Sequence, residues 1–521
     1  MDARIDALFN AYARPDSPGC AVAVLQDGHV HARGYGMADL ELGVPITPAT
    51  VFHIASISKQ FTAFLVHLLA HEGKLSLDDD IRRHVPEVPK LGAARITLRH
   101  LLHHTSGLRD QNTMLKLAGW RPMDERTEGD ILDLVRRQTT LNFRSGEDFN
   151  YCNTGYLLLS VVVSRLTGTP FRAVAEARIF RPLDMKASLV RDDHTKLVNG
   201  RARGYTPAPD GHPAFWMPNF DFAGSTSVHT TAEDLVRWAD NLAHPRVGAE
   251  AVRRLTTPAT LEDGRTIRYG GGVELGSYRG LDVVKHSGWD LGYMAHLAVY
   301  PRERFAVAIL GNLSTLTPEL LARRVADICL AEHFPAPRPE PVDLPEAALR
   351  AKTGLYRHPR TERAYWIHFV DGVLRLSPER EPASGQALRP LGGTSFLGEN
   401  ETTEVTIDDA GLTIQQATGV AQRLDRVMRP WKPGRRALAE YAATYRSAEL
   451  DATVTFRVVK GHLVGERRKW PPQRLAAAYR DAFADDIATY VFVRNRAGTI
   501  VAVVLSLDRI FHLRFDRVRR R

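Results

Sequence analysis

Residues 52–60 have the sequence Phe-His-Ile-Ala-Ser-Ile-Ser-Lys-Gln, in which Ser56 and Lys59 form a Ser-x-x-Lys pair. Apolar residues recur at a helical period over residues 60–69, which predicts a helix that begins near Ser56. Side chains three residues apart on a helix share one face. A lysine kept neutral by burial or by nearby cations can accept the proton of a serine hydroxyl and so activate it as a nucleophile. The pair alone is a weak signal, because a chain of this size holds about one Ser-x-x-Lys by chance.

The composition is typical of a globular protein with several domains. The chain has 521 residues, of which 44% are hydrophobic and 25% charged, and this length predicts about three domains. The 69 basic and 60 acidic residues are interleaved. No nucleic-acid-binding motif accompanies the net charge of +9, so we expect no nucleic-acid partner. The cysteines, Cys20, Cys152 and Cys329, are odd in number and widely spaced, which fits neither a disulfide framework nor a zinc site.

The first residues predict an amphipathic helix with early acidic side chains. They lack the basic and apolar regions of a signal peptide, and no later run of apolar residues reaches the length of a membrane span. We therefore expect a cytoplasmic protein that does not associate with a membrane.

Helical and strand patterns alternate up to residue 332. The predicted helices cover 2–13, 128–138, 157–166 and 318–332, with another opening near Thr230, and the predicted strands cover 19–25, 29–35, 283–288, 293–300 and 305–311. Short turns between the last three strands indicate an antiparallel meander. The pattern predicts an antiparallel sheet with flanking helices.

Three histidines near residue 100 raise the question of a metal site. His100, His103 and His104 have the spacing of ligands on one helical face, but no glutamate stands between them as in His-Glu-x-x-His, and a Thr-Ser-Gly turn follows. We favour a packed helix that leads into a loop, and we expect no metal.

The composition changes at residues 334–341, where four prolines alternate with other residues and predict a semi-rigid linker. An internal repeat follows it. Tyr356 precedes Gly372 by the same distance as Tyr445 precedes Gly461, and each copy consists of short alternating strands with tight turns. The repeat predicts two small antiparallel barrels. We place the domains at 1–334, 345–430 and 436–521.

Three motifs stand in one order along the chain: Ser56-x-x-Lys59, Tyr151-x-Asn153 and His286-x-Gly288. This arrangement resembles the penicillin-recognising serine hydrolases, and the resemblance covers about residues 1–332. A catalytic domain followed by two barrels is most similar in architecture to the D-aminopeptidases of this group. The resemblance implies an α+β fold, with a β-lactamase/transpeptidase-like catalytic domain before the barrels.

The resemblance also implies the roles of the motif residues. Ser56 would attack the carbonyl carbon and become acylated, while Lys59 and Tyr151 would accept its proton and later activate water. Asn153 would hydrogen-bond the Lys59 ammonium and the substrate amide. The backbone N–H groups of Ser56 and Trp289 would form the oxyanion hole. No cofactor is implied.

Two departures from the family pattern bear on the substrate. His286 stands where most relatives carry a lysine, and a neutral imidazole weakens the preference for a substrate carboxylate. The hydrolysis of a small peptide, amide or ester is therefore favoured over that of a β-lactam. The loop at residues 465–475, in which D-aminopeptidases would carry an acidic residue for the substrate amine, is mostly basic. We expect this loop to reach the cleft and Trp470 to contact the substrate.

The predicted function is a serine hydrolase that acts through an acyl-enzyme, similar to a D-aminopeptidase. The alternatives are an esterase, a β-lactamase or penicillin-binding protein of the same fold, and a ligand sensor that is acylated without turnover. The sequence leaves a homodimer open.

Overall fold

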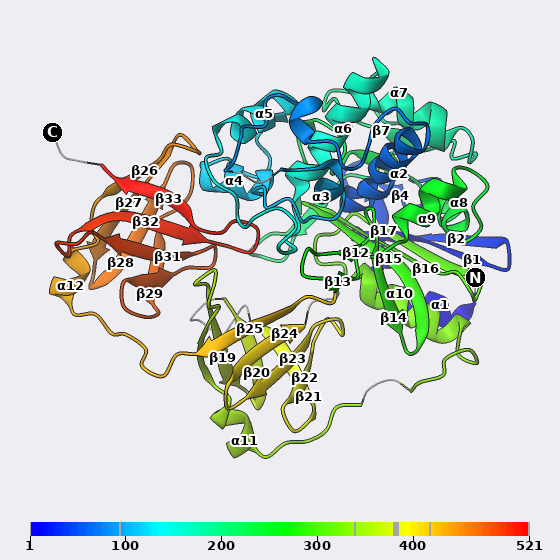
Figure 1. Cartoon of the computed structure of the whole chain (residues 1–521). Helices are drawn as coiled ribbons and strands as arrows, with labels where there is room; N and C mark the ends of the chain where they lie inside the picture. Colours follow the sequence, from blue (N-terminus) through cyan, green and yellow to red (C-terminus); the bar gives the residue numbers. More distant parts are fainter. Residues whose placement is uncertain (1, 93–94, 338–339, 379–384, 416–417, 519–521) are drawn as a thin grey trace. The chain divides into compact units, whose positions relative to one another are not determined.

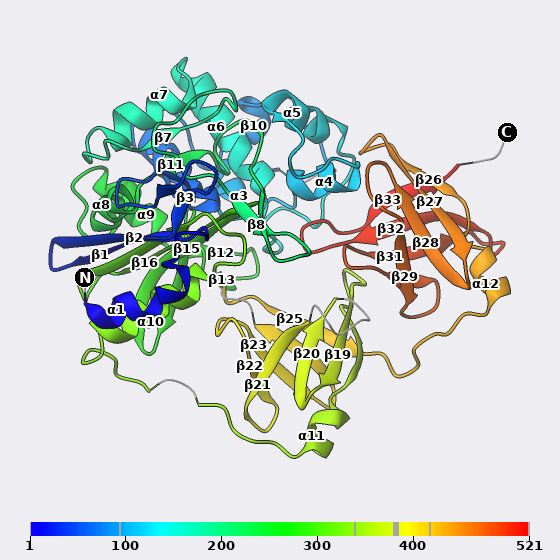
Figure 2. The ribbon, with the colours of Figure 1, turned by 180° about the vertical axis from the view of Figure 1, so that it is seen from behind.

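The computed structural model describes residues 2–92, 95–337, 340–378, 385–415 and 418–518 (Figures 1 and 2). The chain forms two compact units. The first unit comprises Met1–Leu108, Pro122–Arg136 and Phe143–Pro337, and the second comprises Arg109–Arg121, Arg137–Asn142 and Arg338–Arg521.

The first unit contains a six-stranded sheet with the order β14-β15-β16-β17-β1-β2. Every neighbouring pair in it is antiparallel, which confirms the predicted meander. The strands are β14 (Glu274–Tyr278), β15 (Leu281–Asp290), β16 (Tyr293–Tyr300), β17 (Phe305–Gly311), β1 (Cys20–Gln26) and β2 (His29–Tyr35).

Helices cover both faces of this sheet (Figure 1). Strands β1 and β17 are apolar along nearly their whole length and almost completely buried, as expected for central strands between two helical layers. Helices α1 (Ala3–Leu8) and α10 (Pro318–Cys329) pack on one face and share a hydrophobic core with these strands. Helix α8 (Ala232–Ala243) packs on the other face.

Helix α2 (Ser58–His71) is buried along most of its length and packs against α6 and α9, and α6 also contacts α3 and α7. Among its described residues, the first unit contains five further α-helices. They are α3 (Leu98–Leu102), α5 (Glu128–Arg137, whose last residue belongs to the second unit), α6 (Asn153–Thr167), α7 (Phe171–Ala175) and α9 (Ala249–Leu255). Within the part of the chain that the structure describes, the first unit also contains five small sheets. One has three strands, β5 (Phe52–His53), β11 (Val228–Thr230) and β7 (Leu189–Val190). The others are pairs: β6 (Arg126–Thr127) with β10 (Phe220–Asp221); β3 (Met37–Asp39) with β4 (Val44–Pro45); β8 (Tyr205–Pro207) with β9 (Pro213–Phe215); and β12 (Ala259–Thr260) with β13 (Thr266–Ile267).

Helix α2 contains a buried histidine that makes stability depend on pH. Neither ring nitrogen of His67 makes a hydrogen bond to another described residue, and the side chain is 2% exposed. Burial, with smaller contributions from His103 and Arg254, lowers the pKa of His67 to about 3. The unfolded chain has a histidine pKa of about 6.5. Stability from the neutral ring is therefore complete above pH ~6.5 and is lost as pH falls toward 3.

We expect His67→Met to lessen this loss, because methionine fills the site without titrating. Relative to the wild type, the free energy of unfolding of the variant should rise between pH 7.5 and pH 4.5 by up to about 3 kcal/mol. Urea unfolding at the two pH values measures this difference. His29→Met, at an exposed position of β2, is the control. An equal change for both variants would contradict the assignment to His67.

The second unit contains two closed antiparallel barrels of eight strands each, as the repeat predicted. The first consists of β18 (Gly354–Arg357), β19 (Ala364–Val370), β20 (Val373–Ser377), β21 (Gln386–Gly392), β22 (Ser395–Gly398), β23 (Glu404–Asp408), β24 (Gly411–Gln415) and β25 (Ala421–Arg426). The second consists of β26 (Thr444–Ser447), β27 (Ala452–Val459), β28 (His462–Arg467), β29 (Gln473–Ala477), β30 (Ala482–Ala484), β31 (Thr489–Arg494), β32 (Ile500–Ser506) and β33 (Leu513–Arg517). Short helices α11 (Glu346–Ala351) and α12 (Arg435–Ala439) precede them.

The repeated residues have the same structural roles in both barrels. Tyr356 and Tyr445 are fully buried in the first strand of each barrel, and each hydroxyl donates to the carbonyl four residues earlier. The glycines of the repeat, Gly372 and Gly461, lie in two-residue hairpin turns in which both residues have positive φ. This is the turn that matches the twist of the paired strands, and it favours glycine.

Two segments that interrupt the first unit in sequence belong to the second unit, together with helix α4 (Gln111–Leu117). The Arg109 side chain, 1% exposed, pairs with Glu449 at 3.3 Å and donates to the Phe511 carbonyl at 3.2 Å. Asn142 donates to the Arg509 carbonyl and accepts from the Phe511 N–H. Buried polar contacts therefore group 109–121 and 137–142 with the second barrel. The domain boundaries at 334, 345, 430 and 436 stay a prediction.

Among the described residues, no single helix is long and apolar enough to cross a membrane. The pair Asn153–Thr167 and Phe171–Phe180, bent by 82°, meets the length and composition criteria only when taken together.

Candidate active site

Ser56 lies in a sharp turn between strand β5 and helix α2. It sits in the 3-10 turn Ala55–Ile57, one turn before the regular helix begins at Ser58. Ala55 has a φ of 45°, a left-handed conformation that costs a non-glycine residue about 1–3 kcal/mol. The Ser58 hydroxyl accepts from the Val228 N–H at 3.1 Å and anchors the turn to β11. The backbone around Ser56 is thus held in a strained but well-supported conformation.

Strand β15 passes close to this turn because it carries a glycine there. A Cβ atom on Gly288 would lie 2.2 Å from the Ile54 carbonyl oxygen, so no other residue fits without displacing the backbone. Gly288 therefore lets the His-x-Gly strand approach the turn that bears Ser56.

Lys59 points from the first turn of α2 into the buried space beside Ser56. It is 0% exposed. Its Nζ donates to Ser56 Oγ at 3.0 Å, to Asn153 Oδ1 at 2.8 Å and to the Ser225 carbonyl at 2.8 Å. A buried ammonium needs such acceptors to offset its desolvation. The arrangement places a proton-transfer group within hydrogen-bond distance of a serine hydroxyl.

Tyr151 and Asn153 flank the start of helix α6. Asn153 is its first residue and Cys152 its N-cap. The Lys59 Nζ lies 4.9 Å from the centre of the Tyr151 ring, which is within the range of a cation–π interaction. The structure thus brings the first two motifs together around one ammonium group.

His286 lies on β15 and is buried. Its Nδ1 is 2.6 Å from the Ser287 carbonyl oxygen, and its Nε2 is 3.2 Å from the Tyr269 hydroxyl. Burial and the nearby Lys59 ammonium lower the pKa of His286 to about 3. The imidazole is therefore neutral at pH 7, and the strand places no positive charge at this point.

Ser225 is a site residue that sequence reasoning did not single out. Its segment is fixed between two helices: Thr62 of α2 donates to the Gly224 carbonyl, and Ser160 of α6 donates to the Ala223 carbonyl. Gly224 has a φ of 93°, and a Cβ there would lie 2.2 Å from the Tyr156 carbonyl oxygen. The Gly-Ser-Thr-Ser run before α8 was the available signal, but a backbone acceptor leaves no side-chain pattern.

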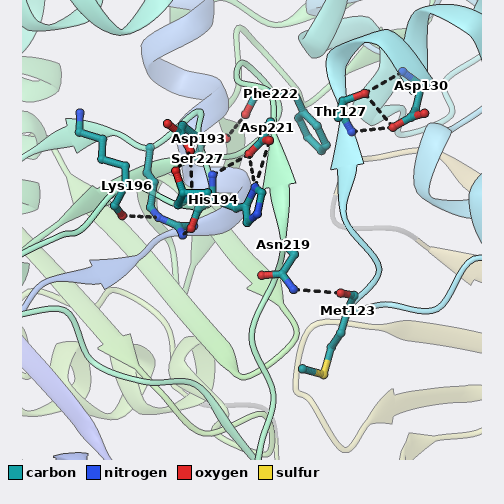
Figure 3. A network of polar contacts seen from close by, with 12 residues as sticks. Met123, Thr127, Asp130, Asp193, His194, Lys196, Asn219, Asp221, Phe222 and Ser227 are labelled. Atoms are coloured by element: carbon teal, nitrogen blue, oxygen red, sulfur yellow. Dashed lines mark hydrogen bonds and ion pairs between the residues drawn. The ribbon is translucent and has the colours of Figure 1, made fainter.

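A polar network fixes the strand that leads into this segment (Figure 3). Asp221 at the end of β10 accepts from the His194 backbone N–H and lies within 2.9 Å of its Nδ1. Asn219 donates to the Met123 carbonyl at 3.0 Å. His194, Asp221 and Glu125 also place ligand-type atoms within 4.8 Å of one another. The mutual pairing of His194 and Asp221 accounts for their positions.

The histidine-bearing segment forms a short helix that leads into a loop, as predicted. Helix α3 ends at Leu102, so His103 caps it and His104 lies beyond it with a φ of 59°. The three histidines therefore do not share a helical face. His104 instead contacts Tyr269, and neither residue was singled out as a site residue from the sequence.

The two tryptophans predicted to bind substrate lie in different units. Trp289 is 68% exposed and follows Gly288 on β15. Trp470 belongs to the second unit, in the turn between β28 and β29. It is half-buried, and Lys116 of α4 lies 5.5 Å from the centre of its ring. The structure thus brings Ser56, Lys59, Tyr151, Asn153, His286 and Gly288 into one unit, and the role of Trp470 stays a prediction.

The sequence model of the Beta-lactamase family matches residues 5–331, which hold all three motifs. The chain belongs to this family. A D-aminopeptidase of Gluconobacter oxydans is 29% identical over 89% of this chain and 86% of its own length. A D-aminopeptidase of Brucella anthropi is 31% identical over 52% of this chain, and here the chain spans only about half of the relative (51%). These matches identify a serine hydrolase similar to the D-aminopeptidases.

Solved structures show the same fold. An octameric penicillin-binding protein homologue from Pyrococcus abyssi has a TM-score of 0.58 at 23% identity, over 81% of this chain and 100% of that one. A D-amino acid amidase from Ochrobactrum anthropi SV3 has a TM-score of 0.52 at 23% identity, over 64% and 99%. The resemblance inferred from the motifs is thereby confirmed at the level of family and fold.

Proposed function

We propose that the protein cleaves amide bonds of small peptides or amino-acid amides, as a D-aminopeptidase-like enzyme, through an acyl-enzyme on Ser56. The observation that carries the proposal is the 3.0 Å contact between Ser56 Oγ and the buried Lys59 Nζ, which Asn153 and Ser225 hold in place. A serine hydroxyl needs a partner that accepts its proton, and Lys59 would do so in its neutral form, in which two N–H groups serve Asn153 and the Ser225 carbonyl and the lone pair faces Ser56 Oγ.

The reaction would proceed in two steps. Ser56 Oγ attacks the substrate carbonyl while the Lys59–Tyr151 pair accepts its proton, and the backbone N–H groups of Ser56 and Trp289 stabilise the oxyanion. The same proton is then delivered to the leaving amine. Water, activated by the same pair, hydrolyses the acyl-enzyme. Asn153, which accepts from Lys59, would also orient the substrate amide.

The neutral His286 supports amides and esters over β-lactams as substrates. The pKa of His286 is lowered to about 3, so no imidazolium is present at pH 7 to attract a substrate carboxylate. An esterase remains the second candidate, because only the leaving group differs. A sensor acylated without turnover would use the same first step.

A turnover screen tests the proposal. One preparation of the full chain is assayed with D- and L-amino-acid p-nitroanilides, short acyl esters and nitrocefin, and the acyl-enzyme is followed by mass spectrometry. We expect multiple turnovers of D-amino-acid p-nitroanilides and a transient acyl-enzyme. Turnover of esters alone would favour the esterase, and an acyl-enzyme that accumulates without turnover would favour the sensor.

The proposal also covers the cellular location, which we propose is the cytoplasm, and the oligomeric state. The described cysteines are free, which is compatible with a reducing cytoplasm. We include a homodimer in the proposal, and light scattering at several protein concentrations tests it. The Gly465–Leu475 loop with Trp470 is proposed to set substrate choice.

Lys59 and Tyr151 are proposed to act as one proton-transfer unit. We expect Lys59→Met and Tyr151→Phe each to lower the acylation rate by about 10³-fold or more, and the double variant to be no slower than the slower single variant. Either loss leaves the proton without an acceptor, so the second loss adds little. Stopped-flow labelling by a fluorophosphonate measures the rates.

A matched control pairs Lys59→Met with Tyr293→Phe. Tyr293 is a buried tyrosine that donates to the Ala202 carbonyl, and its effect should simply multiply with that of Lys59→Met. Multiplying effects for Lys59 and Tyr151 as well would indicate independent roles.

A further inference from the structure

A continuous chain of hydrogen bonds connects residues 150–152, called the Tyr151 loop below, to strand β15, which carries the His-x-Gly motif. The Cys152 backbone N–H donates to His104 Nδ1 at 3.1 Å. His104 Nε2 lies 3.1 Å from the Tyr269 hydroxyl, which lies 3.2 Å from His286 Nε2. His286 Nδ1 lies 2.6 Å from the Ser287 carbonyl oxygen. Every link is within hydrogen-bond distance.

The two ends determine the direction of this chain. A backbone N–H only donates, so His104 Nδ1 must carry a lone pair, and the proton of the neutral ring is on Nε2. His104 Nε2–H then donates to the Tyr269 oxygen, which leaves the Tyr269 proton for an acceptor: His286 Nε2 at 3.2 Å or the Tyr156 hydroxyl, which also pairs with Tyr269. At the other end, a carbonyl oxygen only accepts, so His286 must carry its proton on Nδ1. His286 Nε2 then carries a lone pair that needs a donor, so this end assigns the Tyr269 proton to His286, in agreement with the order that begins at Cys152.

We infer that His104 and Tyr269 are positioning residues that hold His286 in its Nδ1–H tautomer and tie strand β15 to the Tyr151 loop. The inference rests on the proposed function only for its effect on catalysis. Both ring nitrogens of His286 are engaged, one with Tyr269 and one with Ser287. His286 therefore orients the site and takes no proton from the substrate.

His104 holds the Tyr151 loop at more than one point. Its backbone carbonyl accepts from the Asn150 N–H at 2.9 Å, and its ring accepts from Cys152. The same ring packs on the Tyr151 ring with the centres 4.3 Å apart. The left-handed backbone of His104 directs the ring and the carbonyl to this one loop. A change at His104 should therefore move Tyr151 as well.

Tyr269 stays neutral, so it can fix the order of hydrogen-bond donors and acceptors but does not carry a charge. It is 0% exposed and packs edge-on against His286, with 5.9 Å between the ring centres. Burial raises the pKa of Tyr269 well above its usual value, so the hydroxyl keeps its proton. The charged and titratable groups that act on His286 are Lys59, His296 and Lys285, and each disfavours an imidazolium. A neutral, ordered chain is the consequence.

The test reads the tautomer directly by ¹⁵N NMR of histidine side chains in the full chain, with His286→Gln used for assignment. We expect His286 to carry its proton on Nδ1 and Tyr269→Phe to move the Nε2 signal toward that of an unbonded nitrogen. The control Tyr293→Phe likewise removes one buried tyrosine hydroxyl, which in this case donates to the Ala202 carbonyl and not to a histidine, and should leave the His286 signals unchanged. A wild-type Nε2–H tautomer, or no shift in Tyr269→Phe, would overturn the inference.

A second pair of variants tests whether His104 acts through its two hydrogen bonds. His104→Gln keeps an acceptor for Cys152 and a donor for Tyr269, so it should preserve the His286 tautomer; His104→Leu has neither and should lose it. We expect fluorophosphonate acylation to slow by about 10²-fold in Tyr269→Phe and His104→Leu, as for a small misplacement of reacting groups, and much less in His104→Gln. Equal rates for the two His104 variants would contradict the role of hydrogen-bond order. The tautomer result stands even if the substrate screen rejects amide hydrolysis.

Discussion

Replacement of Ser56 by alanine is expected to reduce turnover by about 10⁴-fold or more, as for other serine nucleophiles, and to abolish labelling by fluorophosphonates. The fold should persist, because Lys59 keeps Asn153 and the Ser225 carbonyl as hydrogen-bond acceptors. Intact-mass spectrometry after labelling and a thermal melt measure the two effects separately.

Ser58→Ala is the matched control for this experiment. It is the same substitution two residues further on, and it removes a structural hydrogen bond to the Val228 N–H instead of the nucleophile. We expect it to cost about 1 kcal/mol of stability while labelling continues. A Ser56→Ala protein that still becomes labelled would reject Ser56 as the nucleophile.

Removal of the second barrel by a stop after Pro433 is expected to destabilise the rest of the chain severely. The truncation deletes Glu449 and Phe511, which pair with the buried Arg109 guanidinium. Loss of one partner of a buried ion pair costs about 3–5 kcal/mol, and whole domains are stable by only about 5–15 kcal/mol. Burial already disfavours the charged form and lowers the pKa of Arg109, so the unpaired charge cannot remain buried.

Circular dichroism melts of the truncated and full chains measure this effect. Glu449→Gln isolates the charge: an amide oxygen can still accept from Thr139, as Glu449 Oε1 does, but the anion facing Arg109 is gone. We expect an intermediate loss of stability in this variant. A separately expressed fragment of residues 434–521 should restore folding of the truncated chain when added. A truncated chain that melts cooperatively at the wild-type temperature would show that 109–121 and 137–142 fold without the barrel.

Local spacing explains what could be predicted at the site. Ser56 and Lys59 are one helical turn apart, so any helix beginning there brings them to one face, and the structure places their side chains 3.0 Å apart. The turns at Gly372 and Gly461 were readable for a similar reason, because a two-residue hairpin with positive φ favours glycine. Both are properties of a few neighbouring residues.

Residues distant in sequence could not be joined in this way. His104 and Tyr269 are separated by 165 positions, and a single tyrosine or histidine in a loop has no periodicity that would mark it. The spacing of His100, His103 and His104 even suggested a helical face, whereas the helix ends at Leu102 and His104 turns toward the Tyr151 loop. The helix end is set by contacts of the loop beyond it.

The order of the three motifs, a helix that begins near Ser56, the meander and the paired barrels were determined by the sequence alone, because each depends on periodicity, turn residues or internal repetition. The tertiary structure decided which groups complete the site: the Ser225 carbonyl on Lys59, the His104–Tyr269–His286 chain, and the inclusion of 109–121 and 137–142 in the unit of the barrels. The physical reason is that a buried polar group must find a partner wherever the folded chain places one, and backbone acceptors and single side chains from distant segments leave no local pattern.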